Sequence, residues 1–266
     1  MGSRSATTSS DPFARRFAAR RAAGRRVLVV YVTAGYPDRD ASLALLQGLE
    51  GAGADIIEVG VPFSDPMADG PIIQRSSQRA LELGMTFERT LELIARATLR
   101  VPVVLFTYLN PLLAAGAGAL ARAAAAGAQG VLVTDLPLGA DPELEARIAA
   151  SPLAFIRLAA PTTPAARMQE IARHGSGFVY LISRLGVTGI QTEIAAELPA
   201  TIERLRGVTD LPICVGFGIS TPAQAREAGR FADGVVVGSA LVRAAGESVE
   251  AALALVAALR AGMDAA

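Results

Sequence analysis

Short, almost continuous hydrophobic runs recur along the chain at intervals of about 25 to 30 residues. Several follow the same cue, in which Gly, Ala or Asp precedes Val, Ile and Leu, as in Gly53–Gly60 and Phe231–Gly238. Such runs, rich in β-branched residues, are typical of parallel strands covered by helices. The pattern predicts strands at 27–32, 53–60, 101–107, 127–134, 153–158, 175–182, 211–216 and 231–238.

Segments with a helical spacing of apolar residues lie between these runs. They cover residues 41–51, 86–99, 117–126, 142–149, 164–174, 195–206, 222–229 and 249–260. Eight alternations of strand and helix predict an α/β protein with the (β/α)8, or TIM-barrel, architecture. An open doubly wound sheet is the competing fold. Its usual Gly-x-Gly-x-x-Gly is missing, because Val32 is followed by Thr-Ala-Gly-Tyr-Pro.

The length of 266 residues fits one barrel domain rather than several domains. Residues 1–10 are small and polar and lack the apolar core of a secretory signal. No apolar stretch approaches the ~20 residues that a membrane helix needs. We therefore expect a cytoplasmic protein with no membrane contact, a disordered tail at 1–12 and a catalytic barrel at 13–266.

The residue types that are missing restrict the chemistry. The chain has no lysine and only one histidine (His174), one cysteine (Cys214) and one asparagine (Asn110). A Schiff-base aldolase needs a lysine amine, and a zinc or iron site usually needs several His or Cys ligands. We therefore expect no metal, and any acid–base catalysis must rely on carboxylates. Cys214 is expected to be an inert core residue, and His174 to end a helix at the amino-terminal side of the barrel.

The formal net charge is zero, so nothing favours binding to nucleic acid. Arginines are concentrated between Arg15 and Arg26, at a spacing compatible with one helix that ends at Gly24. We interpret this cluster as a solvated helix face that caps the bottom of the barrel, and assign it no function.

Three acidic residues, Glu58, Asp65 and Asp69, lie in the stretch that leads from the second predicted strand into the following loop. A charged residue that ends a core strand is costly unless it is functional or paired, so Glu58 is predicted to be functional. Burial at this position would raise its pKa and allow proton exchange near neutral pH.

Other polar residues also follow predicted strands, at the end of a barrel where active sites lie. Asn110 and Asp135 equally suit turns, and Tyr180 equally suits the barrel interior. The polar residues at these ends are Thr33, Glu58, Tyr108, Asn110, Thr134, Asp135, Tyr180, Ser183 and Arg184.

Glycine-rich turns follow the last three predicted strands, at 186–189, 216–220 and 238–239. Exposed backbone amides in such turns, together with a short helix that starts at Ser239, form an anion-binding site at the usual phosphate position of a barrel. Since lysine is absent, we expect the phosphate to be held by amides and hydroxyls such as that of Ser239.

Nearly the whole chain after Phe13 resembles the alpha subunit of tryptophan synthase. The resemblance is carried by Tyr31–Pro37, Glu58–Pro71, Tyr108–Asn110, Ser183–Gly189, Gly216–Ser220 and Gly238–Ser239. It implies cleavage of indole-3-glycerol phosphate to indole and glyceraldehyde 3-phosphate by a retro-aldol reaction, with Glu58 and Asp69 as catalytic residues. It further implies that Tyr31, Thr33, Phe106, Tyr108, Thr134, Tyr180 and Thr188 bind the substrate, and that Gly189, Phe217, Gly218, Gly238 and Ser239 bind its phosphate.

The resemblance also implies a beta-subunit partner in an alpha-beta-beta-alpha tetramer. The cofactor pyridoxal phosphate is expected only in that partner, because this chain has no lysine to hold it. The positions that match interface residues of the family are Pro62, Asp65, Asn110 and Pro137. Tyr31, Phe106 and Leu185 differ from the usual residues of the family. These differences bear on the shape of the pocket and on coupling to the partner subunit more than on the chemistry. Two alternatives remain: a stand-alone lyase that releases free indole, and a non-catalytic barrel that binds a phosphate ester.

Overall fold

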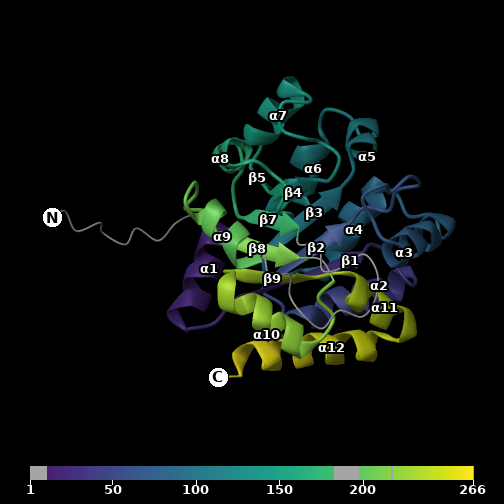
Figure 1. Cartoon of the computed structure of the whole chain (residues 1–266). Coiled ribbons are helices and arrows are strands. Elements are labelled where there is room, and N and C mark those ends of the chain that lie inside the picture. The colour runs from purple at the N-terminus through teal and green to yellow at the C-terminus, as the bar shows by residue number, and fades with distance from the viewer. Residues whose placement is uncertain (1–10, 183–197, 217, 266) are drawn as a thin grey trace.

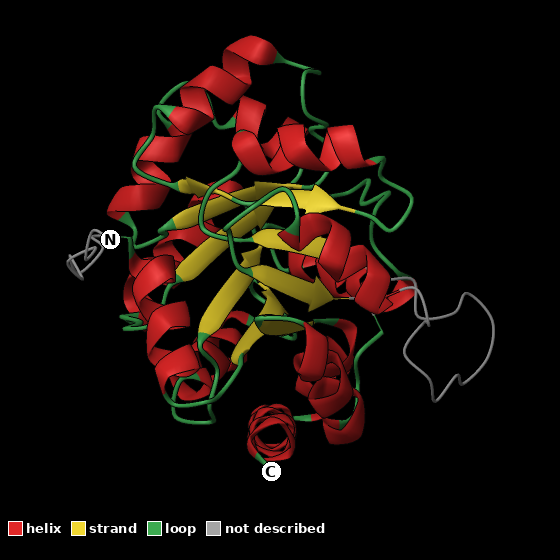
Figure 2. Ribbon diagram, turned by 60° about the vertical axis from the view of Figure 1, so that its left-hand side comes forward, coloured by secondary structure: helices red, strands yellow, loops and turns green. Residues whose placement is uncertain are grey.

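The structure is a computed structural model that describes residues 11–182, 198–216 and 218–265. Its strands form one parallel sheet that curls into a ring, with the helices outside it (Figures 1 and 2). In the described part of the chain the strands are β1 (Val27–Thr33), β2 (Ile56–Gly60), β3 (Val103–Thr107), β4 (Gly130–Val133), β5 (Ala154–Phe155), β6 (Arg157–Ala159), β7 (Val179–Ile182), β8 (Ile213–Gly216) and β9 (Gly234–Val237).

The order of the strands in the sheet is β5-β4-β3-β2-β1-β9-β8-β7-β6. Its two outer strands, β5 and β6, are separated in sequence by Ile156 alone, so the chain itself joins the ends of the sheet. The fifth predicted strand is therefore split: β5 pairs with β4, and β6 pairs with β7. The predicted (β/α)8 barrel is confirmed.

The helices in the described residues include two that the sequence pattern did not predict, α3 and α5. The full set is α1 (Pro12–Ala22), α2 (Arg39–Leu49), α3 (Pro71–Glu82), α4 (Phe87–Ala97), α5 (Leu109–Ala114), α6 (Ala119–Ala125), α7 (Pro142–Ala149), α8 (Ala165–Arg173), α9 (Leu198–Arg206), α10 (Pro222–Phe231), α11 (Ser239–Glu247) and α12 (Val249–Asp264). Several begin at side-chain caps, such as the reciprocal capping box of Thr221 and Gln224 at α10.

Side chains alternate between the two faces of each strand, so each strand contributes to two cores. On β1, Val27 and Val29 belong to a cluster inside the barrel, whereas Leu28 and Val30 pack in the layer between strands and helices. The inner cluster consists of Phe13, Phe17, Val27, Val29, Ile56, Val104, Leu132, Ile156, Phe178, Cys214 and Val236.

Helix α1 closes the amino-terminal end of the barrel. Its Phe13 and Phe17 lie with their ring centroids 6.0 and 6.1 Å from that of Phe178 on the inside. The rings of Phe13 and Phe17 thus form a plug at this end of the barrel. Gly130 leaves room for the plug, because a Cβ added there would lie 2.9 Å from Phe13. The predicted N-terminal tail falls mostly on residues 1–10, outside the described residues, and Asp11 caps α1 with its side chain.

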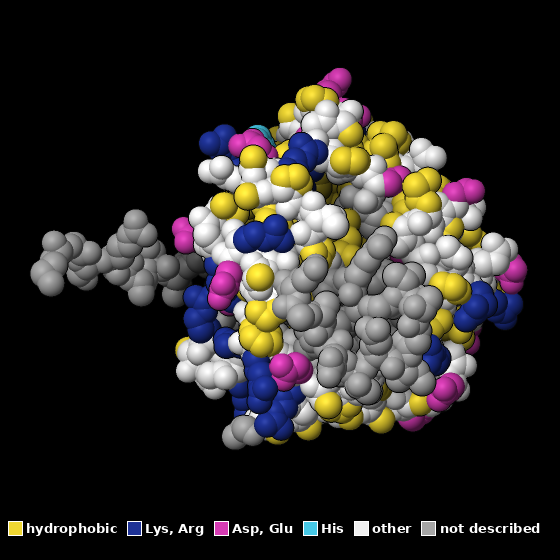
Figure 3. Space-filling model, viewed as in Figure 1, with side chains coloured by type: hydrophobic (Ala, Val, Ile, Leu, Met, Phe, Trp, Pro, Cys, Tyr) yellow, Lys and Arg dark blue, Asp and Glu magenta, His cyan; other side chains and the backbone are white. Residues whose placement is uncertain are grey.

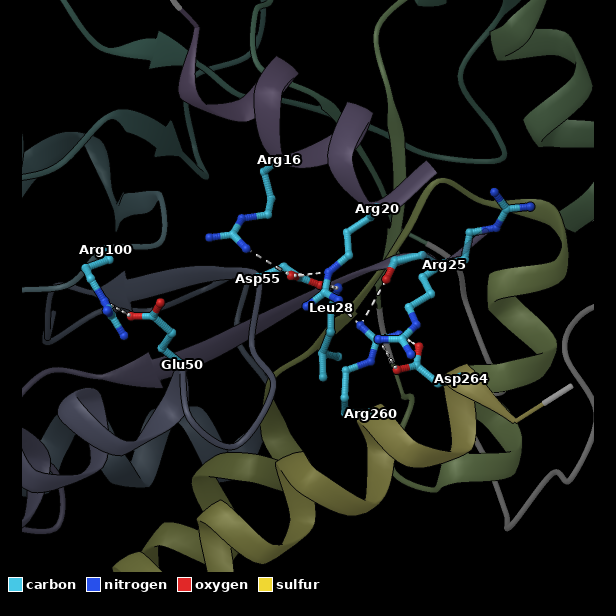
Figure 4. Close-up of polar contacts among 10 residues, drawn as sticks. Arg16, Arg20, Arg25, Leu28, Glu50, Asp55, Arg100, Arg260 and Asp264 are labelled. Atoms are coloured by element: carbon cyan, nitrogen blue, oxygen red, sulfur yellow. Dashed lines mark hydrogen bonds and ion pairs between the residues drawn. The ribbon is translucent and has the colours of Figure 1, made fainter. Parts of the chain in front are cut away.

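The interpretation of the α1 arginines as a solvated face is only partly correct. Arg15, Arg21 and Arg25 are exposed, but Arg16 and Arg20 turn toward the fully buried Asp55 (Figure 4). The Arg20 Nε donates to Asp55 Oδ1 at 2.6 Å. A buried carboxylate at the start of β2 attracts these side chains because its charge needs partners.

The expectations for Cys214 and His174 are confirmed. Cys214 is fully buried inside the barrel. His174 is the exposed C-cap of α8, at the amino-terminal side. On the face seen in Figure 3, arginines and acidic side chains are interspersed. None of the helices in the described ranges is long and apolar enough to cross a membrane.

Candidate active site

Glu58 lies in the middle of β2, two residues before its last residue Gly60, and so does not end the strand as expected. It pairs in register with Tyr31 of β1, and it is completely buried. Neither of its carboxylate oxygens has a hydrogen-bond partner among the described residues. Burial raises the pKa of Glu58 to about 8, because the charged form is poorly solvated there.

Asp69 reaches the same end of the barrel from the loop between β2 and α3. The hydroxyl of Tyr108 donates to Asp69 Oδ2 at 3.0 Å and accepts the backbone N–H of Ala68 at 3.0 Å. The ring of Phe63 packs against that of Tyr108, with centroids 5.2 Å apart. Burial raises the pKa of Asp69 to about 6, although the hydrogen bond from Tyr108 acts in the opposite direction.

The two carboxyl groups therefore differ in charge at neutral pH. A group with a pKa near 8 is mostly protonated at pH 7, whereas one with a pKa near 6 is mostly ionised. Glu58 can donate a proton, and Asp69 can accept a hydrogen bond as an anion. Two carboxyl groups whose pKa values are separated by their environments can perform opposite proton transfers in one reaction.

Aromatic side chains form the walls beside Glu58. The rings of Tyr31 and Phe106 meet edge to face, with centroids 5.1 Å apart. The hydroxyls of Tyr31 and Tyr180 occupy the space where side chains of Gly60 and Gly216 would otherwise lie. Burial raises the pKa of Tyr180, and the charge of Glu58 is the next largest cause.

The hydroxyls of Thr33 and Thr134 already have partners within the protein. Thr33 Oγ1 lies 2.7 Å from Ser76 Oγ of α3, and Thr134 Oγ1 donates to the carbonyl of Thr107 at 3.2 Å. Ser76 was missed by the sequence analysis, since no helix was predicted there. Asp135 accepts the N–H of Leu109 at 2.7 Å, which is the structural role of a turn acceptor.

Of the three predicted phosphate-binding segments, those at 216–220 and 238–239 follow the neighbouring strands β8 and β9, whereas 186–189 lies outside the described residues. Helix α11 begins at Ser239, and its N-cap residue, Gly238, has no side chain to cap the first amides. Gly218 has a φ of 79°, a conformation that glycine adopts without strain. Thr188, Gly189 and Phe217 lie outside the described residues, as do Ser183, Arg184 and Leu185.

Of the four residues expected at a partner interface, Asp65, Asn110 and Pro137 are exposed, whereas Pro62 is buried. Two large apolar side chains near them are also exposed, Met67 by 80% and Leu113 by 46%. Within the described ranges, no group of three or more His, Cys, Asp or Glu side chains is arranged to hold a metal ion.

Comparisons with known proteins agree with this geometry. The family model of the tryptophan synthase alpha chain matches residues 17–265. The chain is 47% identical over 251 residues to the tryptophan synthase alpha chain of Caulobacter sp. (strain K31), covering 93% of this chain and 90% of that protein. It is 49% identical over 242 residues to that of Gluconacetobacter diazotrophicus, covering 90% of this chain and 88% of that protein.

Solved structures show the same similarity. Tryptophan synthase from M. tuberculosis in an aminoacrylate-bound form superposes with a TM-score of 0.86 at 35% identity, covering 96% of this chain and 100% of that chain. The alpha subunit from Legionella pneumophila str. Paris gives 0.86 at 33%, covering 96% and 99%. The closed barrel and the carboxylates at its mouth define a (β/α)8-barrel enzyme. The chain belongs to the tryptophan synthase alpha chain family, and is a lyase with the alpha-subunit role in tryptophan biosynthesis.

Proposed function

We propose that this chain cleaves indole-3-glycerol phosphate to indole and glyceraldehyde 3-phosphate, with Glu58 and Asp69 as the acid–base pair. The observation that carries the proposal is the contrast between a fully buried Glu58 with its pKa raised to about 8 and a partly exposed Asp69 with its pKa raised to about 6. Each carboxyl group has an aromatic neighbour, Tyr31 beside Glu58 and Tyr108 beside Asp69, which suits an indole ring.

The order of steps follows from the protonation states. Asp69, as an anion, accepts the indole N–H and increases the electron density of the ring. Neutral Glu58 protonates the ring carbon that carries the side chain, which gives an indolenine. The Glu58 carboxylate then takes the proton from the adjacent side-chain hydroxyl, and the carbon–carbon bond breaks. Its electron pair returns to the ring, so indole leaves, an aldehyde forms, and Glu58 is protonated again.

The substrate phosphate would bind at the first turn of α11. Backbone amides at a helix N-terminus favour an anion, and the N-cap residue of α11 is a glycine, which has no side chain to cap them. Ser239 adds a hydroxyl at this position. This arrangement needs no lysine, in agreement with the composition of the chain.

The proposed partner is a tryptophan synthase beta subunit, in an alpha-beta-beta-alpha tetramer and with pyridoxal phosphate bound to the beta subunit alone. Exposed Met67 and Leu113 flank the barrel mouth beside Asp65 and Asn110. Apolar side chains exposed together with polar neighbours are typical of a surface that another protein covers.

The direct test measures indole released from indole-3-glycerol phosphate by the purified chain, alone and with a beta subunit added. We expect slow release by the chain alone and faster release with the beta subunit, because docking and cleavage are coupled. A rate that is already high alone and does not change on addition would support the stand-alone lyase. No release under either condition would support a barrel that only binds the ester.

A further inference from the structure

Arg157 and Glu145 form a buried ion pair in the layer between the barrel and the helices. Arg157 points outward from β6, because its neighbours Ile156 and Leu158 pack in the inner cluster. Its guanidinium carbon lies 3.8 Å from the centroid of the Phe155 ring, and its Nη2 donates to Glu145 Oε2 of α7 at 2.5 Å. The proposed reaction does not use this pair.

Stability alone does not explain the pair. The side chain of Arg157 is 5% exposed and that of Glu145 is 11% exposed. The Nη1 atom of Arg157 has no hydrogen-bond partner among the described residues. The cost of removing two charges from water often exceeds the attraction between them, so well-packed apolar residues can be equally stable in their place. The pair is better explained by what the Glu145 carboxylate holds in position.

The second oxygen of Glu145 holds a turn. Glu145 Oε1 accepts the N–H of Gly139 at 2.6 Å. Gly139 is the third residue of the turn 137–140, which is closed by a hydrogen bond of 3.0 Å from the Ala140 N–H to the Pro137 carbonyl. Its φ of 83° identifies a type II turn. Types I and II differ by a reversal of the central peptide, so contacts to this peptide determine which type forms.

Arg167 of α8 holds the other side of the same peptide. Its Nη2 donates to the carbonyl of Leu138 at 2.5 Å, while the N–H of Gly139 in that peptide donates to Glu145. The carbonyl and the N–H of a trans peptide point in opposite directions, so a reversal would break both hydrogen bonds. Charged partners make such bonds stronger than neutral ones do. Two charged side chains from different helices therefore fix the turn from both sides.

The turn lies at the mouth of the barrel, where partner docking is proposed. It follows the carboxyl end of β4, and all of its residues except Leu138 are exposed. Asp135, just before the turn, accepts the N–H of Leu109, the first residue of α5, which also carries the exposed Leu113. An exposed segment that is already fixed in one conformation binds a partner at a lower entropic cost.

We propose that Glu145, Arg157 and Arg167 are positioning residues that hold the turn 137–140 in its type II conformation for docking of the beta subunit. The beta subunit is the expected occupant, because the loop that carries the turn is hydrogen-bonded to α5 of the proposed interface. The inference rests on the proposed function, in which this chain works with that partner.

The first test is Arg167→Met, which removes the contact to the turn carbonyl. Arg167 is exposed, so the variant should keep its stability. Titration calorimetry with a beta subunit should show Kd raised about 5- to 10-fold, because binding then has to order the turn. Arg173→Met is the matched control, since Arg173 is an exposed arginine of the same helix that contacts Glu170 instead. Its Kd should stay within about 2-fold of that of the unmodified chain.

The second test replaces the buried pair by combining Glu145→Leu with Arg157→Met. Apolar residues of similar size avoid leaving one charge unpaired. The Gly139 amide should then exchange with solvent at least about 10-fold faster, and Kd for the beta subunit should again rise about 5- to 10-fold. Because the pair and Arg167 act on one peptide, their combined effect on Kd should be less than multiplicative. Multiplicative effects would overturn the shared role.

Cleavage without the beta subunit separates positioning of the turn from a general loss of function. Indole release by each variant alone should stay within about 2-fold of that of the unmodified chain. The reason is that the N–H and the hydroxyl of Thr134 are held separately by the carbonyl of Thr107, at 3.0 and 3.2 Å. Thermal unfolding confirms that each variant is folded.

The outcomes separate this inference from the proposed function. If the unmodified chain binds no beta subunit, the proposed partner fails and this inference fails with it. If the unmodified chain binds the beta subunit and the folded variants bind it within about 2-fold as tightly, only the role of these residues is overturned. Unchanged exchange of the Gly139 amide in the pair variant would overturn the role of Glu145 in the turn.

Discussion

Glu58 is a residue whose protonation must be linked to the stability of the whole barrel. Its pKa rises from an ordinary value of 4.5 to about 8 on folding, so the folded state binds more protons than the unfolded state between these pH values. Stability therefore falls as the pH rises through this window. The cost at high pH is on the order of a few kcal/mol.

We predict that Glu58→Gln removes this cost. The variant should resemble the unmodified chain in stability at pH 5 and become more stable than it, by an amount that grows toward pH 9. Urea unfolding at pH 5, 7 and 9 measures this difference. Glu143→Gln, at an exposed position of α7, is the control and should show no such trend. Parallel pH profiles for Glu58→Gln and the unmodified chain would contradict the burial of the charge.

The same carboxyl groups should dominate catalysis. We predict that Glu58→Gln and Asp69→Asn each lower kcat by about 10² to 10⁴, the usual contribution of a positioned acid or base. Binding of glycerol phosphate, measured by titration calorimetry, should be nearly unchanged because the phosphate site is separate. Near-normal turnover by either variant would reject the assignment.

At this scale the sequence predicts some features better than others. Burial of Glu58 follows from its place between Ile57 and Val59 in a hydrophobic run. The contact of Tyr108 with Asp69 joins residues 39 positions apart, and that of Thr33 with Ser76 joins residues 43 apart. Such contacts depend on how a loop and a helix pack on the barrel, so residue pattern alone does not predict them.

At the scale of elements, the differences from prediction have physical causes. Helix α3 was missed because its buried face consists of small residues, Ser76, Ser77 and Ala80, which give no hydrophobic periodicity. Helix α5 has only 6 residues, too few for a periodic pattern. The predicted fifth strand splits at Ile156, where the backbone changes from one neighbour to the other.

Helix α1 provides a prediction about packing. Phe13→Ala should lower the free energy of unfolding by about 3–5 kcal/mol, because it empties the plug at the amino-terminal end of the barrel. The control Ala19→Ser, at an exposed position of the same helix, should have little effect. Chemical denaturation compares the variants. A loss below about 1 kcal/mol for Phe13→Ala would show that the plug contributes little.

The turn after β8 provides a prediction about phosphate binding. Gly218 has a φ of 79°, and valine there would strain the turn and obstruct the approach of an anion. Gly218→Val should weaken binding of glycerol phosphate at least about 10-fold in Kd. Gly24→Val is matched in backbone conformation, with a φ of 68°, but lies at the opposite end of the barrel. Equal affinity in folded Gly218→Val would place the phosphate elsewhere.

At the scale of the whole molecule, the barrel separates stability from chemistry. The mouth contains the loop that carries Asp69 and Glu58, which has no hydrogen-bond partner among the described residues. The amino-terminal end is closed by Phe13 and a network of ion pairs. Strand and helix alternation predicts the barrel, and therefore which residues share its mouth. It does not predict this network, because the residues involved are distant in sequence.

Asp55 is the centre of the network (Figure 4). Its Oδ1 accepts from Arg20 of α1, and its Oδ2 accepts from the backbone N–H of Leu28 at 3.0 Å and from Arg260 of α12 at 3.2 Å. One carboxylate at the start of β2 thus contacts the first helix, the first strand and the last helix. The network joins both ends of the folded chain to the barrel.

We predict that Asp55→Asn lowers the free energy of unfolding by about 3–5 kcal/mol, because removing one member of a buried ion pair leaves the other charges uncompensated. Glu88→Gln is the control, since its pair with Arg122 is exposed and should contribute no more than about 1 kcal/mol. Urea unfolding compares the two. Because Asp55 lies at the opposite end from the mouth, folded Asp55→Asn should keep most of its kcat. If the two variants lose equal stability, the network does not hold the ends of the chain. If Asp55→Asn lowers kcat but not the free energy of unfolding, the two ends of the barrel are coupled.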